Sequence, residues 1–224
     1  MFSRRHFIAT GAGALAAAAL HARPLRAADY YEEPMPTTPA DALSRMQAGN
    51  ARFASGQPLA PQRDLARLRA LAPKQTPFGA VLACADSRVP VEILYDQGFG
   101  DLFVVRVAGN VATSVEIASL EYGTRILGAT VLVVLGHSNC GAVKAALQGG
   151  KVPGQISTLY QHIAPALDRK TMDLDHAVIA NVHYQARKLR KGSTVVPDLI
   201  TQGKLALVGG VFDLETGTVK AVDV

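Results

Sequence analysis

Continuous apolar runs alternate with amphipathic segments along most of the chain. Four valine-rich runs bounded by turn residues predict strands, at residues 78–84, 102–107, 130–135 and 205–212. Because the runs lack polar alternation, they are typical of strands covered on both faces, as in a parallel sheet. Helical spacing of apolar residues occurs at 114–127, 142–147, 156–167 and 174–189. The pattern predicts an α/β fold: a mostly parallel twisted sheet with helices on both faces.

Two further helices are expected before the first strand. Asp41 or Ser44 is predicted to cap the first, which carries Leu43, Met46 and Phe53 at roughly helical spacing, and residues 64–71 predict a short second one. Residues 29–39, rich in proline, tyrosine and acid, predict an irregular arm. No repeat or change of composition follows, so residues 40–224 are expected to form one domain.

The first 28 residues have the layout of an export peptide. Arg4 and Arg5 precede an apolar, small-residue stretch that ends at Leu20, and Ala27-Ala28 offers a cleavage site. The apolar stretch is too short to span a bilayer. The Ser-Arg-Arg-x-Phe-Ile order resembles the twin-arginine signal of bacteria. We therefore expect residues 1–28 to be removed, and the mature protein to be periplasmic or exported without a stable membrane anchor.

Composition and charge narrow the class of protein. Apolar residues make up 49% of the chain and charged residues 18%, which excludes a disordered chain and supplies a core. The formal charge of +5 suggests a nucleic-acid partner, but four of the 23 basic residues and no acidic ones lie in the first 28. The remainder carries 19 basic and 18 acidic residues, so no nucleic-acid partner is expected.

The candidate chemistry lies at the ends of two predicted strands. Cys84 closes the first strand, with Asp86 just beyond it, and His137 and Cys140 follow the third. Because the carboxyl ends of parallel strands meet in one crevice, these four side chains are expected to converge. Two sulfurs, an imidazole and a carboxylate or water form a typical zinc set.

Two other interpretations of the cysteines stay open. An exported protein with two cysteines commonly pairs them, so a Cys84–Cys140 disulfide is the main alternative. A redox-active dithiol is the other, although it usually shows a Cys-x-x-Cys motif. The flanking Asp86, Arg88 and His137 favour zinc, because a disulfide does not require them.

Asp86 and Arg88 are spaced to form a pair. A carboxylate and a guanidinium two residues apart can point the same way and bond in a bidentate manner. Beside zinc this pair acts as a switch, since Asp86 either fills the fourth metal position or pairs with Arg88 and leaves the position to water. An open fourth position distinguishes catalytic zinc from structural zinc.

The two motifs resemble the signature stretches of the β-class carbonic anhydrases. They are Cys-Ala-Asp-Ser-Arg-Val at 84–89 and Gly-His-Ser-Asn-Cys-Gly-Ala at 136–142, and the similarity continues through residues 50–53, 100–106, 108–110, 121–122 and 209–217. The resemblance implies reversible hydration of carbon dioxide to bicarbonate and a proton by zinc-bound hydroxide. Cys84, His137 and Cys140 would hold one Zn2+ per chain, with Asp86 as the alternating fourth ligand or, once paired with Arg88, as acceptor of the hydroxide's proton.

The resemblance also implies the substrate-binding residues. Gln75 matches a glutamine that hydrogen-bonds substrate, Phe103 and Tyr122 match pocket-wall residues, and the backbone of Gly141 matches a further contact. In the family the wall residues complete the site across a dimer interface, so a homodimer or a dimer of dimers is expected. Plain core packing is the alternative for Phe103 and Tyr122.

The chain departs from the family pattern at several positions. Ala85 replaces the usual serine, and Ile126 stands where some plant relatives carry a proposed proton-shuttle histidine. Members inhibited by bicarbonate use a tryptophan and a tyrosine where this chain has Val81 and Phe212, so we expect that inhibitory pocket to be absent. Hydrolysis of carbonyl sulfide or carbon disulfide at the same site, and a non-catalytic zinc- or disulfide-stabilised interaction domain, are the competing functions.

Overall fold

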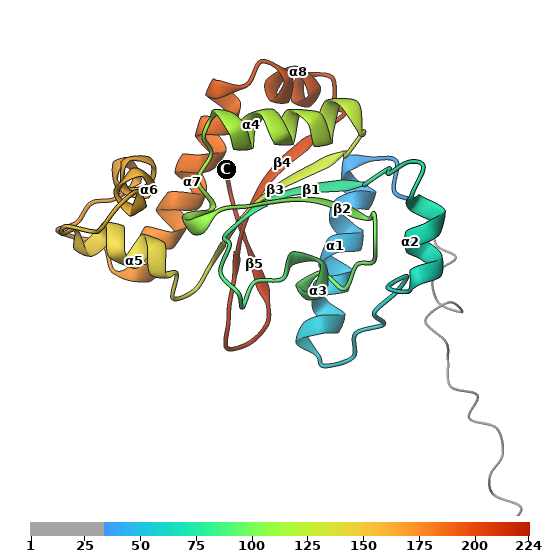
Figure 1. Cartoon of the computed structure of the whole chain (residues 1–224), viewed down its shortest axis with the longest axis horizontal. Helices are drawn as coiled ribbons and strands as arrows, with labels where there is room; N and C mark the ends of the chain where they lie inside the picture. The colour runs from blue at the N-terminus through green and yellow to red at the C-terminus, as the bar shows by residue number, and fades with distance from the viewer. Residues whose placement is uncertain (1–33) are drawn as a thin grey trace, which may run out of the picture.

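A single twisted sheet organises the protein. The computed structural model describes residues 34–224 (Figure 1). The sheet has five strands in the order β2-β1-β3-β4-β5. The strands are β1 (Gly79–Ala83), β2 (Leu102–Arg106), β3 (Val131–His137), β4 (Ala206–Phe212) and β5 (Val219–Val222). The first four run parallel, and β5 pairs antiparallel with β4. The α/β class and the mostly parallel sheet are thus confirmed.

Helices cover both faces of the sheet (Figure 1). Helices α4 (Ser114–Glu121), α7 (Leu174–Gly192) and α8 (Val195–Thr201) pack on one face, and α1 (Pro39–Ala54) and α3 (Val91–Leu94) on the other. Helix α2 (Leu65–Leu71) lies beside one end of the sheet, and α5 (Gly141–Gln148) and α6 (Ile156–Ile163) project from the other end. Short turns of 3-10 helix occur at Ala108–Asn110 and Ala164–Ala166.

The apolar runs are continuous because each face of a central strand meets a helical layer. In β1, Ala80 and Leu82 join the cluster under α4 and α7, whereas Val81 and Ala83 join the cluster under α1 and α3. All five residues of β1 are buried. The expectation of two covered faces is wrong for β2, whose residues are only half-buried because it is an edge strand.

The predicted boundaries hold to within one or two residues for the four strands, but some elements differ. Helices α3 and α8 and strand β5 were not expected. The helix expected at 114–127 ends at Glu121 and continues as a wider π turn, Tyr122–Ile126. Gly123 permits this turn to approach β2, because a Cβ there would lie 2.7 Å from the Phe103 ring. Gly123 thereby brings Tyr122 against Phe103.

The cap predicted for the first helix is wrong. Thr38, rather than Asp41 or Ser44, is the N-cap: its hydroxyl accepts a hydrogen bond from the Asp41 N–H at 3.2 Å. Pro39 then occupies the first helical position, where its missing N–H costs nothing. The helix therefore starts inside the stretch expected to be irregular.

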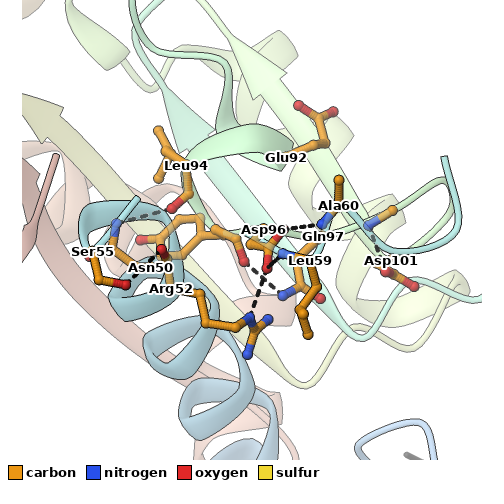
Figure 2. A network of polar contacts seen from close by, with 12 residues as sticks. Asn50, Arg52, Ser55, Leu59, Ala60, Glu92, Leu94, Asp96, Gln97 and Asp101 are labelled. Atoms are coloured by element: carbon orange, nitrogen blue, oxygen red, sulfur yellow. Dashed lines mark hydrogen bonds and ion pairs between the residues drawn. The ribbon is translucent and has the colours of Figure 1, made fainter. Parts of the chain in front are cut away.

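Hydrogen bonds of polar side chains, several of them to one buried carboxylate, attach helix α1 to the rest of the domain (Figure 2). Asp96 accepts hydrogen bonds from Arg52 Nε at 2.7 Å and from the main-chain N–H groups of Leu59 and Ala60 at 2.9 and 2.8 Å. Asn50 of the same helix donates to the Leu94 and Gly217 carbonyls, both at 3.0 Å. The Asn-Ala-Arg-Phe motif at 50–53 therefore joins α1 to α3 and to the β4–β5 hairpin.

Some predictions fall on residues outside the described range. The export peptide at 1–28 and the first five residues of the arm, 29–33, lie outside residues 34–224. Within that range, none of the helices combines the length and the hydrophobicity needed to cross a membrane.

Candidate metal centre

Three ligand-type side chains meet at the carboxyl edge of the sheet. Cys84 follows β1, His137 is the last residue of the adjacent strand β3, and Cys140 is the N-cap residue of α5. Their ligand atoms all lie within 4.8 Å of one another, and all three residues are buried. Parallel pairing of β1 with β3 brings together residues that lie 53 positions apart in the sequence.

The loop between His137 and Cys140 is held in an unusual shape. Asn139 lies in the left-handed region with φ of 52°, which asparagine tolerates better than most residues. Ser138 anchors the loop to the end of β4, because its N–H donates to the Phe212 carbonyl at 2.8 Å and its hydroxyl accepts from the Leu214 N–H at 2.9 Å. These bonds turn His137 and Cys140 toward the same point.

His137 presents a free lone pair to that point. Its Nδ1 lies 2.9 Å from the Ser138 carbonyl oxygen, and a carbonyl can only accept, so Nδ1 carries the proton. The unprotonated Nε2 is buried and has no hydrogen-bond partner in the described part of the chain. A buried nitrogen left in this state fits a metal ligand, and the donor set of two thiols and one imidazole fits zinc.

The two cysteine thiols shift each other's pKa in opposite directions. Both are free thiols, so the disulfide alternative is not formed. A hydrogen bond from Cys140, opposed by burial and helped by the Gly109 N–H, lowers the pKa of Cys84 to about 4. The same hydrogen bond, together with burial, raises the pKa of Cys140. The pair therefore favours loss of a proton from one sulfur, and the thiolate is the form in which cysteine binds a metal.

The pair predicted from the Asp-Ser-Arg spacing is formed beside the cluster. Arg88 donates through Nε to Asp86 Oδ1 at 2.9 Å and through Nη2 to Oδ2 at 2.8 Å. These hydrogen bonds hold the pKa of the Asp86 carboxyl well below its usual range. Asp86 Oδ2 lies 3.8 Å from His137 Nε2, so the carboxylate borders the ligand cluster while it is paired with Arg88.

Sequence reasoning missed two groups that hold the site. Arg106, at the end of β2, donates to the Cys84 carbonyl at 3.1 Å and to the Asp86 carbonyl at 2.6 Å, which fixes the loop that carries both side chains. The Gly109 N–H lies 3.3 Å from the Cys84 sulfur. Neither has a distinctive sequence signal, because the contacts involve main-chain atoms. The only hints were the stretches of similarity at 100–106 and 108–110, which contain Arg106 and Gly109.

The expected substrate residues divide between the two edges of the sheet. Gly141 directly follows Cys140 and lies at the metal edge. Gln75 precedes β1 and is exposed at the opposite, amino edge, where it lines a hollow together with Tyr122. Tyr122 is 49% exposed and its ring lies 6.2 Å from that of Phe103. Within one chain, the structure therefore does not bring Gln75, Phe103 and Tyr122 to the metal residues.

Val81 and Phe212 both lie in the buried cluster beneath α1 and α3. Phe212 also contacts the ring of Phe53, with centroids 6.3 Å apart. The expected absence of an inhibitory bicarbonate pocket stays a prediction. Apolar packing occupies the surroundings of both side chains.

Comparison with known proteins gives a consistent result. A family model described as carbonic anhydrase matches residues 79–219. The chain is 39% identical over 192 residues to carbonic anhydrase of Mycolicibacterium smegmatis, covering 82% of this chain and 93% of that protein. It is 38% identical over 189 residues to carbonic anhydrase 2 of Mycobacterium tuberculosis, covering 81% and 91%.

Solved structures extend the similarity to the fold. The β-carbonic anhydrase CcaA superposes with a TM-score of 0.63 at 26% identity, covering 80% of this chain and 94% of that one. The Coccomyxa β-carbonic anhydrase in complex with acetazolamide also gives 0.63, at 25% identity, covering 81% and 82%. A tetrameric β-carbonic anhydrase of Sordaria macrospora gives 0.61 at 25% identity, covering 81% and 95%.

Proposed function

Because the chain belongs to the β-class carbonic anhydrases, zinc enzymes that reversibly hydrate carbon dioxide, we propose that Cys84, His137 and Cys140 hold its zinc. The convergence of their ligand atoms within 4.8 Å carries the proposal. When bound, zinc supplies an acidified water as the nucleophile for carbon dioxide. The residues beside the zinc site would orient this water and contact the substrate.

Asp86 and Arg88 orient the reaction. The Asp86 carboxylate, held ionised by Arg88, can only accept hydrogen bonds. It would therefore accept a hydrogen bond from the attacking water and turn the lone pair of that water toward the carbon atom of carbon dioxide. While both of its oxygens accept hydrogen bonds from Arg88, Asp86 would not itself be a zinc ligand. The Gly141 backbone lies next to Cys140, where it can contact the substrate.

Metal analysis combined with stopped-flow hydration tests this assignment. The wild type should contain one zinc per chain, and Asp86→Asn should keep that zinc but hydrate carbon dioxide about 100-fold more slowly. Asp175→Asn, at an exposed position of α7, is the matched control and should retain full activity. An Asp86→Asn enzyme as fast as the wild type would remove Asp86 from the mechanism.

The protein acts as a homodimer, or a dimer of dimers, in this proposal. Gln75, Phe103 and Tyr122 lie at the amino edge of the sheet, away from the metal residues of their own chain. A partner chain that supplies these three side chains completes the site with its hydrogen-bond donor and its aromatic wall. The exposure of Tyr122 beside the hollow supports this arrangement over core packing.

Complementation between two inactive chains tests the shared site. Cys84→Ser removes a metal ligand, and Gln75→Ala removes the substrate contact. If each site takes Cys84 from one chain and Gln75 from the other, a mixed dimer contains one intact site. The mixed dimer purified after co-expression should then show about half of the wild-type activity, whereas the separate variants stay low. No recovery in a purified mixed dimer would place Gln75 within its own chain or outside the site.

The domain of residues 40–224 reaches the periplasm, or a compartment beyond it, by twin-arginine export in this proposal. The order of Arg4, Arg5, the apolar stretch and Ala27-Ala28 supports it. A cell fractionation experiment in a bacterial host compares the wild type with the double variant Arg4→Lys, Arg5→Lys. The wild type should be recovered outside the inner membrane without residues 1–28, and the variant should stay in the cytoplasm at full length. Equal export of both would contradict the route.

A further inference from the structure

Two buried amides face inward from α7. Asn181 is 1% exposed and Gln185 is 0% exposed, and they lie one helical turn apart. Their neighbours on the same helix face are apolar: Ala177, Val178, Val182, Ala186 and Leu189 are all buried. Two amides in an apolar layer destabilise the fold unless they are hydrogen-bonded. Their hydrogen-bond partners therefore indicate the role of these two side chains.

Apart from the hydrogen bond between the two amides, all of their partners but one belong to the segment that follows β2. Asn181 Nδ2 donates to the Gly109 carbonyl at 2.9 Å and to Asn110 Oδ1 at 3.4 Å. Gln185 Oε1 accepts from the Ala112 N–H at 2.9 Å, and its Nε2 donates to Asn181 Oδ1 at 2.8 Å. The remaining bond runs from Gln185 Nε2 to the His162 carbonyl at 2.8 Å.

These bonds leave no freedom in how the amides are oriented. A main-chain N–H can only donate, so the Gln185 atom that faces Ala112 is the oxygen, and its nitrogen must face Asn181. Asn181 then accepts with its oxygen, and its nitrogen is directed at the Gly109 carbonyl. The pair is therefore a directional chain that ends on Gly109.

Gly109 connects this chain to the metal site. Its carbonyl is held by Asn181, and its N–H donates to the Cys84 sulfur at 3.3 Å. The turn is conformationally demanding, because Gly109 and Asn110 both lie in the left-handed region, with φ of 73° and 43°. A glycine there can rotate easily unless its peptide groups are fixed on both sides.

We propose that Asn181 and Gln185 are positioning residues that hold the Gly109 N–H on the Cys84 sulfur and so set how tightly that sulfur binds metal. The inference rests on the proposed assignment of Cys84 as a zinc ligand. An N–H donor to the sulfur fixes the direction in which its lone pairs point, as the outer hydrogen-bond partners of other metal ligands do. Loss of the amides frees the turn, and the sulfur loses its donor while the ligand itself remains.

Cobalt(II) substitution and zinc release test the proposal in the full mature protein. In Asn181→Leu, which replaces the amide by an apolar group of similar size, the sulfur-to-cobalt absorption band should shift. Zinc transfer to a chelator should become about tenfold faster. Gln185→Met removes the amide one step farther along the hydrogen-bond chain, and it should change the cobalt band and the zinc release rate in the same direction. If Asn181→Leu does not fold, Gln185→Met tests the proposal in its place.

A matched control separates positioning from loss of stability. Leu189→Ala removes a buried apolar side chain of the same helix without touching the turn, so it should lower the Tm yet leave the cobalt band and the zinc release rate unchanged. Folded Asn181→Leu and Gln185→Met proteins with wild-type bands and release rates would overturn the positioning role. A wild-type protein without any sulfur-to-cobalt band would overturn the assignment of Cys84 itself, and the inference with it.

Discussion

At the scale of single residues, the Asp86–Arg88 pair should decide whether Asp86 stays clear of the proposed metal position. Arg88 is bidentate to Asp86 and keeps its pKa low, below the ordinary carboxyl value of about 3.9. Because folding lowers this pKa, the pair stabilises the protein at every pH above the ordinary carboxyl value. That stabilisation is lost only as the pH falls through the lower pKa of the folded state. Between pH 6 and 9 Asp86 therefore stays ionised and paired.

Removing Arg88 should release Asp86 toward the metal ligands. In Arg88→Leu the pKa of Asp86 rises toward its ordinary value, but the carboxylate is still ionised at pH 7.5 and only 3.8 Å from His137 Nε2. We expect hydration at pH 7.5 to fall roughly 10- to 100-fold. Arg88→Lys, which offers a single point charge in place of a fork, should fall by less. Stopped-flow rates between pH 6 and 9 check this, and equal rates for all three proteins would contradict it.

The sequence was sufficient to group the site's side chains but not its main-chain contacts. Cys84, Asp86 and His137 could be brought together because the carboxyl ends of adjacent parallel strands meet. The Gly109 N–H and the carbonyls held by Arg106 could not be predicted, because every residue carries such groups and only the tertiary fold selects which ones are used. Asn181 and Gln185 likewise read as ordinary polar positions of a helix.

At the scale of elements, α1 is attached through a buried charge as well as through apolar contacts. The Asp96 side chain is fully buried, whereas its partners Arg52 and Arg63 remain 29% exposed. The carboxylate also satisfies two main-chain N–H groups of the loop after α1. A single side chain therefore fixes both the helix and the loop.

Asp96→Asn should loosen this attachment. Asparagine keeps the shape and tolerates the left-handed backbone at this position, where φ is 49°, so the change isolates the loss of charge. We expect the free energy of unfolding to fall by about 2–3 kcal/mol, because charged hydrogen bonds are lost in a buried site. Urea titration measures it, with Glu215→Gln on the exposed hairpin turn as the control. A loss no larger than that of the control would show that the carboxylate charge is dispensable.

Apolar patterns predicted the central elements better than the peripheral ones. Strands β1, β3 and β4 give continuous apolar runs because a helical layer covers each face. Helix α3 has only four residues, too few for a helical period to appear. From the sequence alone, Gly49 only suggests a less stable position within α1. In the structure a Cβ at Gly49 would lie 1.8 Å from the Tyr95 carbonyl oxygen, so the glycine permits the close approach of α1 to the end of α3.

At the scale of the whole molecule, the proposed metal would link α5 to the two adjacent strands β1 and β3. Its three ligands come from the end of β1, the end of β3 and the start of α5. A ligand that binds only the folded state stabilises it by mass action, and unfolding must release the metal.

Zinc removal should therefore reduce stability without abolishing the fold. The apolar clusters on both faces of the sheet do not depend on the metal, so the protein should stay folded after treatment with a chelator. We expect the Tm to fall by at least about 5 °C and to recover when zinc is restored. Cys84→Ser, which lacks a ligand, should show no change with the chelator. An unchanged Tm in metal-free wild type would show that the metal does not stabilise the folded state.

The amino edge of the sheet carries exposed apolar side chains that a single chain leaves uncovered. Leu68, Phe99, Tyr122 and Ile126 are 47%, 42%, 49% and 67% exposed, and all four line the hollow that includes Gln75. Clustered apolar exposure of this kind marks an interface. If a partner chain covers this hollow while it supplies Gln75 to the opposite metal site, association and activity depend on the same surface.

Ile126→Lys tests that dependence. A charge placed in a covered apolar contact must be desolvated, so we expect the dimer to dissociate at micromolar concentrations, as measured by analytical ultracentrifugation. Hydration should fall with the fraction of dimer and recover at high protein concentration, because the metal residues of each chain are untouched. Ile156→Lys changes an isoleucine that is 47% exposed on α6, away from this hollow, and should leave both properties unchanged. An Ile126→Lys protein that is monomeric yet fully active would mean that each chain completes its own site, and Gln75 and Tyr122 would then need another role.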